Sequence, residues 1–96
     1  MRSEFLTRQR KILIAKQDEY RALAADFRDG GSLPDRIRFK FHVLLPAVTR
    51  ALEKIGLGDY YVCDECGESI PLRRLELVPA ATHCVGCQEA RDVRAA

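Results

Sequence analysis

Four cysteines constrain this chain more than any other feature of its sequence. They form two C-x2-C pairs, Cys63 with Cys66 and Cys84 with Cys87, separated by seventeen residues. Two residues between paired cysteines allow one chain reversal to direct both sulfurs at a single ion about 2.3 Å away. Four thiolates complete a tetrahedron around Zn²⁺ and leave no position for water. We therefore predict one zinc ion with a structural role.

The same cysteines have three alternative uses. Disulfides are disfavoured in the reducing cytoplasm, which is the compartment that we expect for this chain. A redox C-x-x-C motif normally opens a helix in a βαβ unit and does not occur as a matched pair. An iron–sulfur centre also uses four cysteines, but the two-plus-two spacing favours a zinc ribbon.

His83 could in principle replace a neighbouring thiolate. Because the cysteine set is complete, we expect His83 to lie exposed beside the site and His42 to be solvated.

Two helical patterns precede the cysteines. Between residues 4 and 28 apolar side chains recur every seven residues, which predicts a helix. Residues 29–34 break the pattern, because two glycines, Ser32 and Pro34 suit the end of one helix and the start of another. A second stripe continues past Pro46, which we expect to kink this helix without ending it. The stripes comprise Leu6, Leu13, Tyr20, Leu23, Ala24 and Phe27, and then Ile37, Phe41, Leu44, Val48, Leu52 and Ile55.

These patterns together predict a mainly α fold. An antiparallel two-helix coiled-coil hairpin spans residues 1–57, and a small four-cysteine zinc finger with a short C-terminal helix, residues 88–94, spans residues 58–96. Gly67 permits the tight backbone that a metal-binding knuckle needs. We expect Ile70, Leu75 and Leu77 to pack around the cysteines and onto the base of the hairpin. On the helical pattern alone, the hairpin is equally well explained as a plain packing unit.

The size and charge of the chain limit the classes of function that the sequence allows. A chain of 96 residues builds a small core, which usually needs a staple such as a metal ion. The formal net charge is +2, and four thiolates around one Zn²⁺ would bring it near zero, so a strong attraction to nucleic acid is absent. There is no signal-peptide core and no long apolar span, which predicts a cytoplasmic protein away from the membrane. No nucleophile pair or phosphate-binding glycine loop is visible, so we expect no enzymatic activity.

The stretch from Ala51 to Glu89 closely resembles the DksA/TraR family of bacterial zinc-finger transcription regulators. This resemblance implies a protein that binds bacterial RNA polymerase directly, without sequence-specific DNA binding, and inserts its hairpin through the secondary channel. We expect the protein to be a monomer. It also implies that acids in an Asp-x-x-Asp-x-Ala pattern at the hairpin tip alter initiation. The matching positions are Leu52, Ile55, Gly58, Tyr60, Cys63, Cys66, Gly67, Ile70, Arg74, Leu75, Glu76, Pro79, Cys84, Cys87 and Gln88.

Three acids are candidates for the tip. Asp26 and Asp29 stand in an Asp-x-x-Asp-x-Gly pattern at the end of the first helix, and Asp35 stands in a Ser-x-x-Asp-x-Ile pattern at the start of the second. Neither pattern reproduces the alanine. Each acid is also explained as an ordinary solvated or helix-end residue, because an acid in a first helical turn favours the helix dipole. The arms are shorter than in full-length family members by about ten residues, or roughly 15 Å.

The resemblance also bears on guanosine tetraphosphate, which in the family binds between regulator and polymerase through basic side chains. Alignment through the motif places Ala47, Val78 and Gln88 at those basic positions. Three missing cations remove charge-assisted contacts to phosphate. We therefore expect weak or absent dependence on this nucleotide.

Two other functions remain open from the sequence. A zinc ribbon that binds nucleic acid would use a basic face, for which Arg73, Arg74, Arg91 and Arg94 are available, although acids interleave with them. A hairpin adaptor or inhibitor would block its partner without any chemistry from the tip carboxylates.

Overall fold

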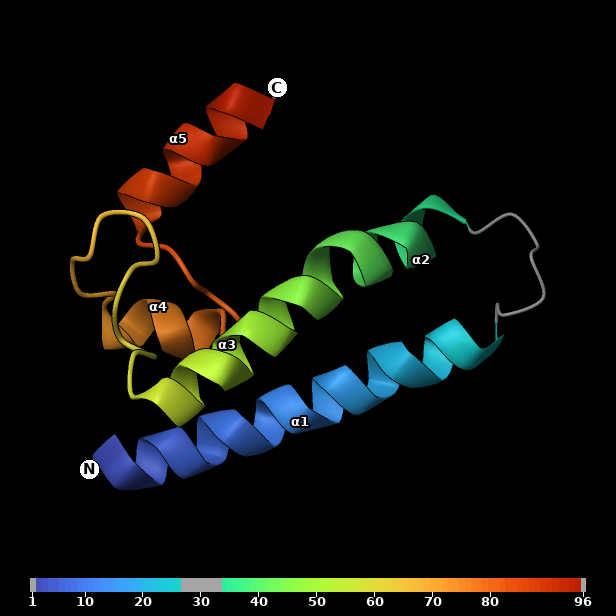
Figure 1. Ribbon diagram of the computed structural model, residues 1–96, viewed down its shortest axis with the longest axis horizontal. Helices are drawn as coiled ribbons and strands as arrows, with labels where there is room; N and C mark the ends of the chain where they lie inside the picture. The colour runs from blue at the N-terminus through green and yellow to red at the C-terminus, as the bar shows by residue number, and fades with distance from the viewer. Residues whose placement is uncertain (1, 27–33, 96) are drawn as a thin grey trace.

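A computed structural model describes residues 2–26 and 34–95, and within them the fold is mainly helical, as predicted. A long N-terminal helix runs antiparallel to a second helical arm, one short helix lies beside the base of this hairpin, and the last helix projects away from it (Figure 1). The described residues contain no strand, only an isolated antiparallel bridge between Val62 and Ser69. The elements are α1 (Arg2–Asp26), α2 (Asp35–Phe39), the π-helical turn η1 (Lys40–Leu44), α3 (Leu45–Leu57), α4 (Leu72–Leu77) and α5 (Val85–Ala95).

The hairpin gives the molecule an elongated shape. Its principal extents are 43 × 33 × 20 Å, and its radius of gyration of 14.5 Å exceeds the roughly 12.5 Å typical of a compact domain of this length. The 25 residues of α1 account for about 37 Å of this length. Among the described residues, no helix combines the length and apolar character needed to cross a bilayer.

The first predicted stripe is confirmed in its middle, wrong at Ala24 and incomplete at its start. Leu13 and Tyr20 are buried, Leu6 and Leu23 are half-buried, and Ala24 is exposed. Phe27 lies outside the described residues. The sequence pattern did not identify the buried side chains Phe5 and Gln9, which contact the C-terminal segment.

The second arm passes Pro46 through a widened helical turn. Proline has no N–H, and its ring clashes with the carbonyl four residues earlier, which here belongs to His42. His42 lies within η1, and Pro46 is the second residue of α3. A π-helical turn is one of the known causes of helix kinks. The helical path therefore continues past the proline, with the irregularity placed before it.

A left-handed glycine ends α3. Gly58 has a φ of 82°, its N–H donates to the Ile55 carbonyl at 3.2 Å, and the Asp59 N–H donates to the Lys54 carbonyl at 2.8 Å. This pair of bonds is the Schellman arrangement, which satisfies carbonyls at a helix end. It turns the chain sharply into the cysteine segment.

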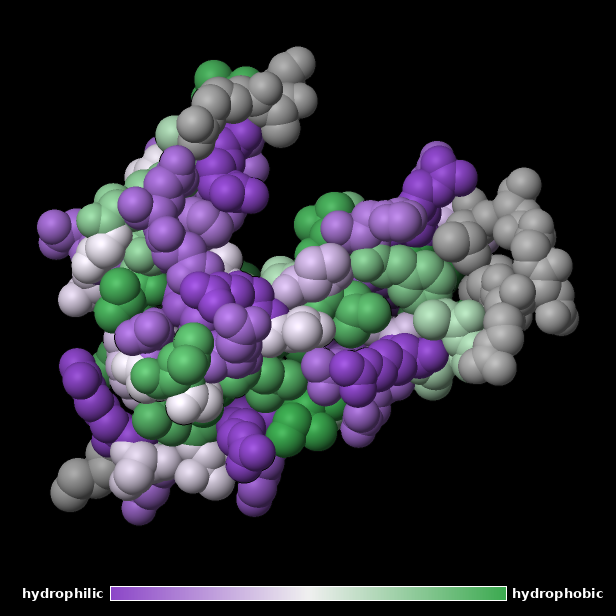
Figure 2. Space-filling model, in the orientation of Figure 1, coloured by the Kyte–Doolittle hydropathy of each residue, from purple (hydrophilic) through white to green (hydrophobic). Residues whose placement is uncertain are grey.

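The segment between the cysteine pairs packs as predicted at two of three positions. Ile70 and Leu75 are buried, but Leu77 is 67% exposed, so its prediction as a core residue is wrong. The reason is helical geometry, because two residues along α4 correspond to a rotation of about 200°. If Leu75 faces the core, Leu77 must face outward. On the face shown in Figure 2, apolar side chains gather where α1, α3 and α4 meet, and hydrophilic ones project from the outer edge of α1.

Gln9 joins α1 to the C-terminal segment. Its amide nitrogen donates to the Tyr60 hydroxyl at 3.1 Å and to the Leu75 carbonyl at 2.7 Å, and Tyr60 donates in turn to the Pro79 carbonyl at 2.7 Å. One turn earlier, the ring of Phe5 stacks on that of Tyr61 with centroids 6.3 Å apart. The start of α1 is therefore attached to the C-terminal segment by the two hydrogen bonds of Gln9 and by the stacked ring of Phe5.

Replacing Gln9 by leucine should destabilise the protein by about 1–3 kcal/mol, because the Leu75 carbonyl would lose its buried donor. The measurement is urea unfolding of the full chain in the presence of zinc. Gln17→Leu is the matched control, because the Gln17 amide donates to the exposed Thr49 hydroxyl, at 3.3 Å, and not to a buried carbonyl among the described residues. Equal losses for the two variants would contradict a special role for Gln9.

Candidate metal centre

The four cysteine sulfurs converge on one point. All four lie within 4.8 Å of one another, and the sulfurs of Cys66 and Cys84, from different pairs, are 3.7 Å apart. A tetrahedron with zinc–sulfur bonds of about 2.3 Å has edges of roughly 3.8 Å. All four are free thiols in the structure. The donor set and its spacing therefore fit a tetrahedral metal ion.

The first pair lies on a tight knuckle between residues 63 and 67. Gly67 adopts a φ of 77°, and its N–H donates to the Cys63 carbonyl at 3.1 Å. The Cys63 N–H donates to the Glu68 carbonyl at 2.8 Å, and the Glu65 N–H lies 3.5 Å from the Cys63 sulfur. Such amide contacts to sulfur orient a metal ligand. The role predicted for Gly67 is consistent with its left-handed backbone.

The second pair spans the start of α5. Cys84 immediately precedes the helix, Cys87 lies in its first turn, and the Gln88 N–H donates to the Cys84 carbonyl at 2.9 Å. The helix thus begins at Val85, three residues earlier than the sequence predicted. Residues three apart on a helix share a face, so this early start places both sulfurs on one side.

The thiols influence one another strongly. Burial alone would raise the pKa of Cys63, but hydrogen bonds from the backbone N–H groups of Cys66, Cys84 and Glu65 outweigh it and lower that pKa to about 6. Hydrogen bonding with the Cys84 and Cys66 sulfurs raises the pKa of Cys87 to about 12. The chain's own groups therefore favour ionisation of the Cys63 thiol and oppose ionisation of the Cys87 thiol. A divalent cation would remove this opposition.

The two histidines lie outside the sulfur cluster. His83 is half-buried, not exposed as predicted, and its Nδ1 is 2.9 Å from the Thr82 hydroxyl while its Nε2 is 3.4 Å from the Arg91 guanidinium. Both ring nitrogens thus have partners other than a metal. His42 is exposed, as expected for a solvated residue.

The candidate tip acids stand at the other end of the molecule. Asp26 is the last residue of α1 and Asp35 is the first of α2, and Figure 1 shows both helix ends far from the cysteine segment. The Asp35 side chain is fully exposed, 4.0 Å from the Arg38 guanidinium. Asp29 lies outside the described residues.

The positions aligned with the nucleotide-binding cations lie on two surfaces. Ala47 and Gln88 line a cleft of about 520 Å³ that also contains Arg50 and Arg91. Arg50 is already paired, with Asp64 at 3.0 Å and Glu53 at 2.6 Å. Val78 lines a separate apolar groove.

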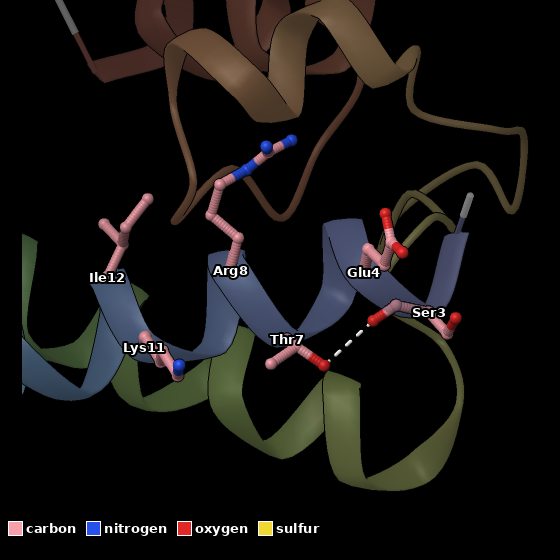
Figure 3. Close-up of a pocket in the computed structure, with 6 residues that line it drawn as sticks. All are labelled: Ser3, Glu4, Thr7, Arg8, Lys11 and Ile12. Atoms are coloured by element: carbon pink, nitrogen blue, oxygen red, sulfur yellow. Dashed lines mark hydrogen bonds between the residues drawn. The ribbon is translucent and has the colours of Figure 1, made fainter.

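A third hollow, of about 500 Å³, has no convergent chemistry. Figure 3 shows that its residues all belong to α1, with Glu4, Arg8 and Ile12 pointing to one side of the helix and Thr7 and Lys11 to another. Its one internal hydrogen bond joins the Thr7 hydroxyl to the Ser3 carbonyl at 2.9 Å. The cysteine cluster is therefore the stronger candidate for a functional centre.

Comparisons with known proteins agree with this geometry. A family model described as the prokaryotic dksA/traR C4-type zinc finger matches residues 58–92. The solved structure of the RNA polymerase binding protein and transcriptional regulator Dks from Chlamydia trachomatis is 31% identical, with a TM-score of 0.66 over 93% of this chain and 88% of that one. The chain belongs to the DksA/TraR family.

Two further DksA/TraR proteins extend the comparison. The structure of the transcription factor DksA2 from Pseudomonas aeruginosa is 31% identical, with a TM-score of 0.51 over 95% of this chain and 80% of that one. The RNA polymerase-binding transcription factor DksA of Haemophilus influenzae is 36% identical over 63 residues, which span 66% of this chain and 43% of that protein. The chain thus matches less than half the length of this curated relative. These relatives are named as transcription factors and regulators, not as enzymes.

Replacing a single cysteine should release the metal. We expect the full chain to contain about one zinc ion per molecule, and Cys87→Ser to weaken zinc binding by more than the roughly 10–100-fold typical of changes around the ligands. The measurement is metal analysis of reduced protein, followed by competition with a chelator. Val85→Ser is the control, because it changes an exposed side chain between the same two cysteines. Equal zinc binding by both variants would exclude Cys87 as a ligand.

Proposed function

We propose that this chain is a DksA-like regulator of transcription initiation that binds bacterial RNA polymerase through the secondary channel. The observation that supports this most is the match to Dks from C. trachomatis across nearly the whole length of both chains, hairpin included. In this proposal residues 1–57 are the inserted arm and residues 58–96 the metal-binding unit. The protein acts as a cytoplasmic monomer.

The metal in this proposal is zinc with a structural role. Cys63, Cys66, Cys84 and Cys87 would supply all four ligands, and four thiolates leave no position for a reacting water. Hydrogen bonds within the chain fix the backbone beside each of the two cysteine pairs. The zinc unit thereby anchors the base of the arm.

The arm would carry acids to the polymerase active centre. A helical hairpin is stiff, and its free end bears Asp26 and Asp35, with Asp29 between them in sequence. A carboxylate delivered near catalytic Mg²⁺ or a mobile catalytic loop would alter initiation through its charge. Since α1 is only about 37 Å long, the chain must act as a short-hairpin regulator or seat more deeply.

The tip acids should affect the response and not the binding. We expect the full chain to be captured by bacterial core polymerase and displaced by a secondary-channel competitor. The triple change Asp26→Ala, Asp29→Ala and Asp35→Ala should keep this capture but lose the effect on initiation in a promoter assay. Asp18→Ala, at an exposed position in the middle of α1, is the control.

Two other results of this experiment would each support one of the alternative functions, the adaptor or inhibitor and the nucleic-acid-binding ribbon. A full effect from the triple variant would favour an adaptor or inhibitor that acts by blocking. Absence of capture, together with salt-sensitive DNA binding by the isolated protein, would favour a nucleic-acid-binding ribbon.

Guanosine tetraphosphate should change the response little. Ala47, Val78 and Gln88 supply no cation, and the Arg50 guanidinium in the nearby cleft is already neutralised by two carboxylates. The measurement is initiation in vitro with and without the nucleotide, at fixed amounts of this protein and polymerase. A large and saturable synergy would contradict this expectation.

A further inference from the structure

Lys54 is a fully buried cation beside the cysteine cluster. It belongs to α3 and has 0% of its surface exposed. Its ammonium donates to the Val62 carbonyl and to the Thr82 carbonyl, the latter at 3.4 Å, and lies 3.2 Å from an Asp64 carboxylate oxygen. Lysine is almost never fully buried unless it is paired, because removing its charge from water costs several kcal/mol. All three of its partners lie within two residues of a cysteine.

These contacts reach both cysteine pairs. Val62 and Asp64 flank the first cysteine of the first pair, and Thr82 lies two residues before the second pair. The Thr82 carbonyl also accepts the Asp64 backbone N–H at 2.9 Å. The Thr82 carbonyl, next to the second cysteine pair, therefore accepts from both Lys54 and Asp64, which lies in the first pair's knuckle. Lys54, a residue of the hairpin, thus helps to set the separation of the two cysteine pairs.

The same contacts orient the peptide that leads into the first ligand. The Val62 carbonyl accepts from Lys54, and the N–H on the other side of that peptide, from Cys63, donates to the Glu68 carbonyl at 2.8 Å. A planar trans peptide held at both its oxygen and its nitrogen cannot rotate. The position of the Cys63 Cα, from which its sulfur projects, is fixed as a result.

Arg50 completes the arrangement from the solvent side. Its guanidinium donates to both Asp64 carboxylate oxygens, at 3.0 and 3.1 Å, but no contact from it to a knuckle carbonyl is seen among the described residues. Arg50 therefore holds the carboxylate that faces Lys54, whereas Lys54 alone among the hairpin side chains described here bonds to the backbone of both knuckles.

We propose that Lys54 is a positioning residue of the metal centre: it holds the two cysteine knuckles at the separation that an ion needs, and it couples metal binding to the attachment of the hairpin. The proposal rests on the zinc centre of the proposed function. Coupling of this kind is reciprocal, because contacts that favour the metal-binding geometry are themselves strengthened when the metal binds. Loss of the ammonium thus weakens metal binding even though Lys54 touches no metal.

The test compares zinc affinity among full-length variants by competition with a chelator at constant pH. Lys54→Met keeps the aliphatic stem and removes the ammonium, and we expect it to bind zinc about 10–100-fold more weakly. Arg50→Met is the matched control and should lose less than about 3-fold, because it touches Asp64 alone of the knuckle residues named here. A second measurement is the visible spectrum of the Co²⁺-loaded protein, whose tetrahedral thiolate bands should shift in Lys54→Met and not in Arg50→Met.

The outcomes separate this inference from the metal centre itself. If the wild-type chain binds no zinc, the metal centre is wrong and the role of Lys54 falls with it. If the wild type binds zinc and Lys54→Met matches it in affinity and Co²⁺ spectrum, only the role of Lys54 is overturned, and the lysine merely stabilises the hairpin. If Lys54→Met does not fold, Asp64→Asn decides: weaker zinc binding supports the proposal, and unchanged binding overturns it.

Discussion

Four cysteine sulfurs lie within 4.8 Å of one another in a segment whose own apolar core is small. In residues 58–92, a fully described stretch, one isolated bridge supplies the only sheet-type pairing. A core of this size does not offset the entropy lost in ordering about 35 residues. Thiolates brought together also repel one another, so their convergence makes physical sense when a cation lies between them. The buried side chains of the segment are Tyr60, Cys63, Ile70, Leu75 and Ala81.

The metal-binding segment also organises the hairpin, because its contacts with both helices lie at the same end of the molecule. Gln9 and Phe5 attach the start of α1, and Lys54 attaches the end of α3. The opposite end of the hairpin, with Asp26 and Asp35, has no such contacts among the described residues. An arm that is anchored at one end and bears acids at the other is suited to reach into a partner, as the proposed function requires.

Much of this arrangement could be predicted from the sequence because it follows local rules. The C-x2-C pairs set the sulfur cluster, glycines mark the knuckle and the end of α3, and apolar spacing locates the hairpin. Gln9 and Lys54 could not be found in this way, because their partners lie in other segments and polar side chains carry no apolar periodicity. Leu77 fails for a related reason: hydrophobicity alone does not say which face of a short helix is buried.

Hydrogen–deuterium exchange of the full chain, with zinc bound and after its removal, tests most directly whether the metal orders the molecule. Removal should abolish protection across residues 58–92 and lower it at the hairpin ends nearest the cysteines, around Gln9 and Lys54, while the middle of the hairpin around Leu13 and Val48 stays protected longer. Unchanged protection of residues 58–92 without metal would contradict the central claim, because the segment would then be held by its own packing alone.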